Sequence, residues 1–213
     1  MFGVNASYPL SNKLTGTLFV INDYFHLAHP NNVPSSGGQL AYKATGRLTA
    51  KETVLFGPHQ QDTALEFWRF FSDSIAEWKS TKVTTAFEYQ VGTEKVAIAV
   101  SPRALWTSAQ LPVHWNVHGP WSVTLRPEFC WDRDGRWTGH EQLVKAMTTT
   151  IEYRLAYRWT TTIVRVEHRY DNSTGNGGGF FTEGAVPGTI GLTPSQHLLI
   201  GAVIFTVDSQ SHP

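Results

Sequence analysis

The sequence predicts an all-β fold, an antiparallel up-and-down transmembrane β-barrel with about eleven strands present. Three observations lead to this prediction. Apolar and polar residues alternate along most of the chain, which is the period of a β-strand. Short and long connections alternate between these segments, as in a meander whose short turns all lie at one end. Many segments reach about 10–13 residues, roughly twice the length of a typical strand in a soluble protein.

The alternating segments follow one another along the whole chain, and residues 1–213 are expected to form one domain. In residues 121–131 every odd position is apolar, from Trp121 to Trp131, and the polar residues take the even positions. The clearest segments are residues 2–8, 68–78, 83–90, 110–117, 121–131 and 160–170. Residues 48–56 and 198–207 are also expected to be strands, but their patterns leave open which face is apolar.

The connections between these segments indicate how the strands are joined. Short joins are expected at residues 10–13, 45–47, 80–82, 118–120 and 155–157. Long joins rich in Gly, Pro and Asn are expected at residues 26–38, 58–66, 92–103, 132–142 and 171–195. The first and the last strand both run toward the short-turn end, which gives an odd number of strands, whereas single-chain bacterial barrels have an even number. The sequence therefore predicts a partial barrel, the C-terminal part of a longer one.

The composition excludes several classes of protein. Lys and Arg number 17 and Asp and Glu number 17, so the net charge is zero. A nucleic-acid partner is not expected, because phosphate binding needs an excess of basic residues. The single cysteine, Cys130, excludes an intrachain disulfide and a cysteine-based zinc site. The 9 histidines, including the pair His26 and His29, lack partners at metal-ligand spacing, so neither a metal nor another cofactor is expected.

Alternation alone does not identify what each face of the sheet meets. A soluble barrel turns the apolar face inward, whereas a membrane barrel turns it toward lipid and encloses a wet lumen. The spacing of the tryptophans favours the membrane barrel: Trp68 and Trp78 stand 10 residues apart, and so do Trp121 and Trp131. Ten residues of a tilted strand rise roughly 25 Å, the height of the apolar band of an outer-membrane barrel. We therefore predict that these four tryptophans form two aromatic girdles.

The polar face of the predicted strands carries charged residues at mid-strand. In a wet lumen these residues would set a transverse field and filter solutes by charge. The alternative is that opposite charges on adjacent strands neutralise each other and stabilise the wall without selecting solutes. The near balance of the two signs argues against strong selectivity for anions or cations. The predicted lumen-lining residues are Arg69, Asp73, Glu77, Glu88, Arg126, Glu128, Glu152, Arg154, Arg165, Glu167 and Arg169.

Two alternatives to a membrane pore stay open. Small polar residues such as Ser72 and Ser74 lie on the predicted lipid face, which keeps open a soluble β-barrel that binds a small ligand. An outer-membrane barrel hydrolase needs a nucleophile beside a base, and the sequence offers Ser173 with His168 nearby. The Gly-x-Ser-x-Gly motif is absent, so no catalytic residue and no enzymatic activity are predicted.

The glycine-rich stretch within residues 171–195 is not followed by a predicted helix, so it does not indicate a phosphate-binding loop. It is expected to be either an exposed loop or an inward-folded constriction. In either case, Phe180 and Phe181 are candidates to anchor it by burial.

Specific sequence motifs occur in order along the chain. They are Arg47-Leu-Thr, Leu65-Glu-Phe-Trp-Arg-Phe, Val117-His-Gly-Pro-Trp-Ser-Val-Thr-Leu-Arg-Pro-Glu-Phe, Trp131-Asp-Arg-Asp-Gly-Arg-Trp-Thr-Gly, Tyr157-Arg-Trp-Thr-Thr-Thr, Val166-Glu-His-Arg-Tyr-Asp, Gly177-Gly-Gly-Phe-Phe and Leu192-Thr-Pro-Ser-Gln-His. With these motifs the chain resembles the C-terminal half of the putative β-barrel porin-2 family, the OmpL-like outer-membrane porins of Gram-negative bacteria. The resemblance implies passive diffusion of small hydrophilic solutes through a water-filled lumen in the outer membrane. It implies outer-membrane lipids and these solutes as partners, and it leaves a homo-oligomer open.

Overall fold

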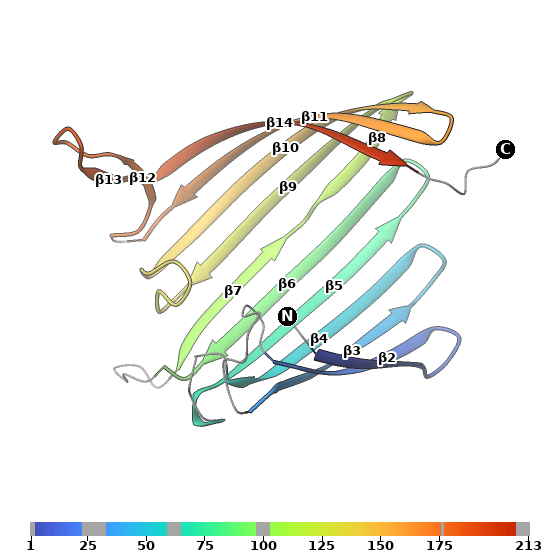
Figure 1. Cartoon of the computed structure of the whole chain (residues 1–213), viewed down its shortest axis with the longest axis horizontal. Coiled ribbons are helices and arrows are strands. Elements are labelled where there is room, and N and C mark those ends of the chain that lie inside the picture. Colours follow the sequence, from blue (N-terminus) through green and yellow to red (C-terminus); the bar gives the residue numbers. More distant parts are fainter. Residues whose placement is uncertain (1–2, 23–32, 59–64, 97–102, 176, 208–213) are drawn as a thin grey trace.

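The structure, a computed structural model, describes residues 3–22, 33–58, 65–96, 103–175 and 177–207. Its main feature is one large, curved antiparallel sheet in which strands that follow one another in sequence lie side by side (Figure 1). The described part of the chain has one short 3-10 helix, Leu65–Phe67. None of its helical segments has the length and apolar character needed to span a membrane. The predicted all-β, antiparallel up-and-down architecture is confirmed.

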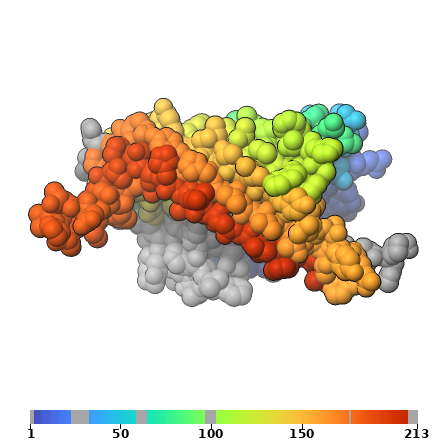
Figure 2. Space-filling view, turned by 90° about the horizontal axis from the view of Figure 1, so that it is seen from above, coloured from blue at the N-terminus to red at the C-terminus, as the bar shows by residue number. Residues whose placement is uncertain are grey.

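The strands of the large sheet are β1 (Gly3–Pro9), β2 (Leu14–Ile21), β3 (Ser35–Lys43), β4 (Leu48–Pro58), β5 (Trp68–Lys79), β6 (Val83–Glu94), β7 (Ala104–Gln110), β8 (Val113–His118), β9 (Trp121–Asp132), β10 (Gln142–Tyr157), β11 (Thr160–Ser173) and β14 (Ser195–Val207). β12 (Phe180–Glu183) and β13 (Ile190–Thr193) form a separate hairpin that projects from the sheet (Figure 1 and Figure 2). β7 and β8 follow each other between the same two neighbours, β6 and β9. They make one spanning strand, interrupted at Leu111 and Pro112, because proline cannot donate a ladder hydrogen bond. Counted in this way, the described sheet has the predicted eleven spanning strands.

The register of the sheet shows a steady stagger from strand to strand. One continuous row of paired residues begins at Pro9, the last residue of β1, and ends at Gln196, the second residue of β14. The row thus climbs from the short-turn end to the long-loop end by roughly one residue per strand. A rise of ~3.3 Å over a strand spacing of ~4.8 Å corresponds to a strand tilt of about 35°, which is typical of a barrel wall.

The large sheet has two open edges within the described ranges. There β1 pairs with β2 alone, and β14 pairs with β11 alone. An open edge leaves backbone donors and acceptors unpaired, which a lipid environment does not tolerate. Closing the wall therefore requires that both edges find strand partners.

The two faces of the sheet differ in the side chains that they carry. We call the face that carries Trp121 the outer face and the opposite one the inner face. The outer face is mostly apolar, and the inner face holds most of the charged groups. On the outer face Leu125 and Val166 are 46% and 51% exposed. Glu94 and Asp132, on the inner face, are among the largest fully buried side chains of the described chain. A soluble barrel would bury the apolar face instead, so this distribution supports a sheet with lipid on its outer side.

The register also assigns the faces of the two strands that the sequence leaves open. In β14 successive residues such as Leu198 and Leu199 are apolar, so both faces are apolar and no alternation is visible. In β4 the register places Glu52 on the outer face, opposite Ser74. Ser74 and Ser72 each donate a hydroxyl hydrogen bond to the Glu52 carboxylate, Ser72 at 2.6 Å. The small polar residues on the predicted lipid face are therefore partners of this carboxylate.

Candidate functional site

All eleven residues predicted to line a lumen lie on the inner face of the sheet. The strand pairing shows how: Glu152 of β10 stands opposite Ser122 of β9 and Arg165 of β11, on one face. The same pairing, followed strand by strand, puts onto this face Arg69, Asp73, Glu77, Glu88, Arg126, Glu128, Glu152, Arg154, Arg165, Glu167 and Arg169. These side chains therefore share one side of the wall, opposite the exposed apolar side chains.

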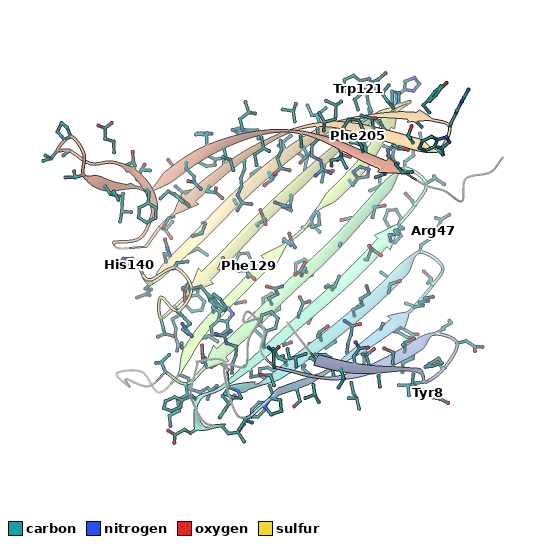
Figure 3. All side chains as sticks on the ribbon, viewed as in Figure 1. Tyr8, Arg47, Trp121, Phe129, His140 and Phe205 are labelled. Carbon is teal, nitrogen blue, oxygen red and sulfur yellow. The ribbon has the colours of Figure 1, made fainter. Side chains whose placement is uncertain are left out.

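The four tryptophans predicted to form girdles lie on the outer face. Trp78 and Trp121 lie at the short-turn ends of their strands, and Trp68 and Trp131 lie at the long-loop ends. Figure 3 shows Trp121 at the same end of the sheet as Phe205, an outer-face aromatic of β14. Aromatic side chains thus mark both ends of the apolar face.

One charged cluster on the inner face connects β9, β11 and β14. Arg169 Nη1 donates to Glu128 Oε2, and Arg126 Nε lies 3.3 Å from the same oxygen. Arg169 Nε also donates to Asp171 Oδ1 at 2.8 Å, and Gln196 Nε2 donates to Asp171 Oδ2 at 2.9 Å. The two arginines and two carboxylates balance in charge, as cross-strand pairing favours.

A second charged cluster lies nearer the short-turn end, on β9, β10 and β11. Glu152 accepts hydrogen bonds from Arg165 Nε at 2.6 Å and from Ser122 Oγ at 3.3 Å. Thr150 Oγ1 donates to Glu167 at 2.9 Å. Together the two clusters form a charged belt on β9, β10 and β11, defined by Arg126, Glu128, Glu152, Arg165, Glu167 and Arg169.

The acidic residues of β5 and β6 have different surroundings from those of the charged belt. Glu88 accepts hydrogen bonds from the side-chain amides of Gln90 and Gln110, both at 2.6 Å. Glu77 forms an ion pair with Lys79 at 2.9 Å. Asp73 lies on the inner face of β5, opposite Gln90, and Arg154 lies near the turn that joins β10 to β11. The structure therefore brings the predicted residues of β9–β11 other than Arg154 together in the charged belt, and Glu88 of β6 lines a hollow beside it with Glu128 and Arg169.

A buried ion-pair cluster lies at the long-loop end of the inner face, and the sequence pattern indicated only its Arg69. Arg69 Nη2 donates to Glu94 Oε2 at 2.8 Å, and Arg136 Nε donates to the same oxygen at 2.6 Å. The side chain of Glu94 has no exposed surface, and that of Arg69 is 5% exposed. Because Arg136 belongs to the loop between β9 and β10, the shared carboxylate fastens this loop to the wall.

A second buried carboxylate holds the same loop. Asp132, the last residue of β9, accepts hydrogen bonds from the backbone N–H groups of residues 136–138 at 2.8, 2.7 and 2.8 Å. Gly135, with a φ of 66°, supplies the left-handed turn that brings these groups back to Asp132. The loop of residues 133–141 is thus fixed against the inner wall through two carboxylates.

Two tryptophans pack around these ion pairs. Trp106 lies over Gly92, where a Cβ atom would stand 2.1 Å from the indole ring, so only glycine fits. Trp137 meets Trp106 edge to face with the ring centroids 5.5 Å apart. The guanidinium carbon of Arg69 lies 4.9 Å from the Trp137 ring centroid, a cation–π distance. We call this set the loop latch; it consists of Arg69, Glu94, Trp106, Asp132, Arg136 and Trp137.

The glycine-rich loop after β11 is not anchored in the expected way. Residues 180–193 form the hairpin of β12 and β13, which projects from the sheet (Figure 2). Phe181 is 85% exposed, so the prediction that it anchors the loop by burial is wrong. A loop that does fold against the inner wall is the one of residues 133–141, which the loop latch holds.

The structure does not assemble the candidate hydrolase pair. Ser173 lies on the inner face of β11, whereas His168 lies on its outer face and contacts His197, Nε2 to Nδ1, at 3.1 Å. A nucleophile and its base must lie within hydrogen-bond distance, so Ser173 and His168 do not form a catalytic pair. Among the residues that the structure describes, no three or more His, Cys, Asp or Glu side chains are placed to hold a metal ion. The histidine pair His26 and His29 lies outside them.

Comparison with known proteins matches residues 1–207 to a family described as "Putative beta-barrel porin-2, OmpL-like". No curated protein sequence matches the chain. Among solved structures, the fold is similar to that of an anion-selective porin from Comamonas acidovorans, with a TM-score of 0.64 and 13% sequence identity. The similarity covers 95% of this chain and 58% of that porin, so the chain spans little more than half of its length. At this identity the likeness concerns the fold alone.

Proposed function

The chain belongs to the putative β-barrel porin-2, OmpL-like family, and from this premise we propose that it forms the wall of a pore for passive diffusion of small hydrophilic solutes. The protein lies in the bacterial outer membrane, the location of this family. The observation that carries the proposal is the reversed distribution of side chains, with an exposed apolar outer face and a charged inner face. Such a wall meets lipid on one side and water on the other.

The charges of the inner face support weak charge selectivity. In the charged belt, Arg126 and Arg169 share the Glu128 carboxylate, and Arg165 pairs with Glu152. Paired charges of both signs leave a small net field, so ions of either sign can pass. The porin family supports a channel without enzymatic activity, and the proposal includes no catalytic step.

The proposed pore is a single barrel domain completed by further strands. Support comes from the open edges at β1 and β14 and from the eleven spanning strands of the described chain. Bacterial barrels close with an even number of strands and leave no free edge. Outer-membrane lipids would surround the outer face, and a second copy of the chain would bind there if the protein forms homo-oligomers.

Planar-bilayer recordings of the whole protein test this proposal. The expected result is a stepwise conductance in KCl that is equal for both voltage signs to within about twofold, with a weak ion preference. If the protein is folded in detergent but gives no conductance steps, this result contradicts the proposal. Monodisperse protein in detergent-free buffer would contradict the membrane placement and favour the soluble ligand-binding barrel.

Glu52 offers a separate test of which face meets lipid. The Glu52→Leu variant is expected to raise the free energy of unfolding by about 1 kcal/mol, because a carboxylate on the lipid face is unfavourable and two serine hydrogen bonds offset this only in part. Urea unfolding in lipid vesicles, followed by tryptophan fluorescence, measures the change. Glu88→Leu is the control on the inner face and should be destabilising, because it removes the acceptor of two amides. A destabilised Glu52→Leu variant would argue against lipid at this face.

A further inference from the structure

A row of apolar side chains crosses the inner face at some distance from the charged belt. It follows the register from β2 to β7 and consists of Phe19, Gly37, Leu55, Phe71, Gly92 and Trp106. We call it the aromatic row. Phe19 and Phe71 are half-buried, and Leu55 and Trp106 are buried. Phe19 and Phe71 thus keep part of their apolar surface on a wall that faces water, and exposed apolar surface of this kind is typical of a binding site.

The two glycines make the aromatic row a flat platform. A Cβ atom on Gly37 would stand 2.5 Å from Cζ of Phe19, and one on Gly92 would stand 2.1 Å from the Trp106 ring. Both rings therefore lie over backbone that has no side chain of its own. Trp137 of the loop latch, 43% exposed, adds a further ring at the long-loop end.

A second row, two residues along each strand toward the short-turn end, carries hydroxyl and amide groups. We call it the polar row; it consists of Ser7, Thr17, Gln39, Thr53, Asp73, Gln90 and Ser108. Some members already bond to one another: Gln39 Nε2 donates to Thr53 Oγ1 at 2.9 Å, and Ser108 Oγ donates to Gln90 Oε1 at 3.1 Å. Asp73 is the one charged member of this row. The row therefore offers donors and acceptors suited to neutral polar groups.

Two adjoining hollows run along these rows. The larger, with a volume of about 460 Å³, is lined by Phe19, Thr53 and Asp73 among others. The smaller, of about 220 Å³, reaches Trp137. Both are lined by Leu55 and Phe71, so they form one path along the wall. An apolar floor with a few converging polar groups is the usual character of a small-molecule site.

We propose that the aromatic row and the polar row form a binding track for uncharged carbohydrates, an inference that rests on the proposed pore function and names its solute class. A sugar ring presents a face of C–H groups, which packs on aromatic rings, and an edge of hydroxyl groups, which bond to hydroxyls and amides. The two rows supply these contacts about 6.6 Å apart, the rise of two residues along a strand.

The charges near the track favour a neutral solute over an ionic one. The arginines of the charged belt lie on β9 and β11, away from most of the track on β2–β6; its end at Gln90 and Ser108 borders a hollow that Arg169, paired there with Glu128, also lines. Arg69, next to the aromatic row on β5, already donates to the buried carboxylate of Glu94. The two rows together thus contain one charge, that of Asp73, and it would repel anions.

Single-channel recordings of the whole protein with maltotriose test the track. Maltotriose is expected to interrupt the KCl current in resolved events, whereas a polyethylene glycol of the same size lowers the current evenly. Phe71→Ala is expected to weaken the maltotriose block by about threefold to tenfold, because it removes one stacking ring. Phe87→Ala is the matched control, since Phe87 is an exposed phenylalanine on the outer face of β6. Maltotriose should block this variant as strongly as the unchanged protein.

The outcomes separate the track from the pore itself. If the KCl conductance is normal but maltotriose blocks the current no more than polyethylene glycol does, the track is overturned and the pore function still stands. No KCl conductance at all would overturn both. If Phe71→Ala fails to fold, Trp137→Ala tests the same platform from an exposed position in a loop, and it too should weaken the block. A Trp137→Ala channel that maltotriose blocks as strongly as the unchanged protein would count against the track.

Discussion

Replacing Glu94 with alanine is expected to lower the free energy of unfolding by about 3–5 kcal/mol and to increase the single-channel conductance. The Glu94 side chain is fully buried and accepts hydrogen bonds from Arg69 and Arg136. Without it, Arg69 stays buried with its opposite charge removed, and Arg136 no longer fastens the loop of residues 133–141 to the wall. Denaturant unfolding in lipid vesicles measures the stability. Bilayer recordings measure the conductance, which should increase because the loop is no longer fixed at the inner wall.

A control from the same loop makes this result specific. Glu141→Ala removes an exposed carboxylate of the loop and should leave both stability and conductance unchanged. The free energy of unfolding of Glu94→Gln should lie between those of Glu94→Ala and Glu141→Ala, because the amide oxygen still accepts a hydrogen bond but carries no charge. If Glu94→Ala unfolds at the same denaturant concentration as the unchanged protein, the loop latch does not stabilise the fold.

Replacing Glu128 with glutamine is expected to raise the permeability ratio of chloride to potassium by about tenfold. Glu128 is the carboxylate that Arg126 and Arg169 share, so its loss leaves an excess of positive charge in the charged belt. One unit charge about 6 Å from a passing ion changes the energy of that ion by ~0.7 kcal/mol in a wet lumen, with opposite signs for chloride and potassium, so their ratio changes by ~1.4 kcal/mol, which is about tenfold. The reversal potential in a KCl gradient measures the ratio.

Glu52→Gln is the matched control for this change, since it removes the same charge from the outer face of the sheet. Its reversal potential should equal that of the unchanged protein. An unchanged reversal potential in Glu128→Gln would mean that the belt residues only neutralise one another and do not select ions. That is the alternative reading of mid-strand charges that the sequence leaves open.

The faces of most strands could be predicted from the sequence because a strand has only two of them. Once residues 121–131 place Trp121 on one face, Arg126 and Glu128 must lie on the other. The pattern fails where one face is not uniform. Glu52 interrupts the apolar face of β4. Its carboxylate is accommodated there by hydrogen bonds from Ser72 and Ser74, which lie on the neighbouring strand β5.

The loop latch could not be predicted in this way, because its contacts join residues far apart in the sequence. Glu94 and Arg136, which share a hydrogen bond, are 42 positions apart. Asp132 binds amide groups four to six residues ahead, which no strand or helix period encodes. The one local signal was the motif from Trp131 to Gly139, which contains the turn glycine and the charged residues but does not indicate which wall they meet.

The stagger of the sheet makes the inner wall chiral on the scale of a solute. Because the strands are tilted, a row of paired residues winds around the wall as it climbs instead of circling at one height. A molecule that follows the aromatic row therefore turns as it advances, always in the same sense. Two enantiomers of one sugar, equal in size and polarity, would meet this winding surface in different orientations and cross it at different rates.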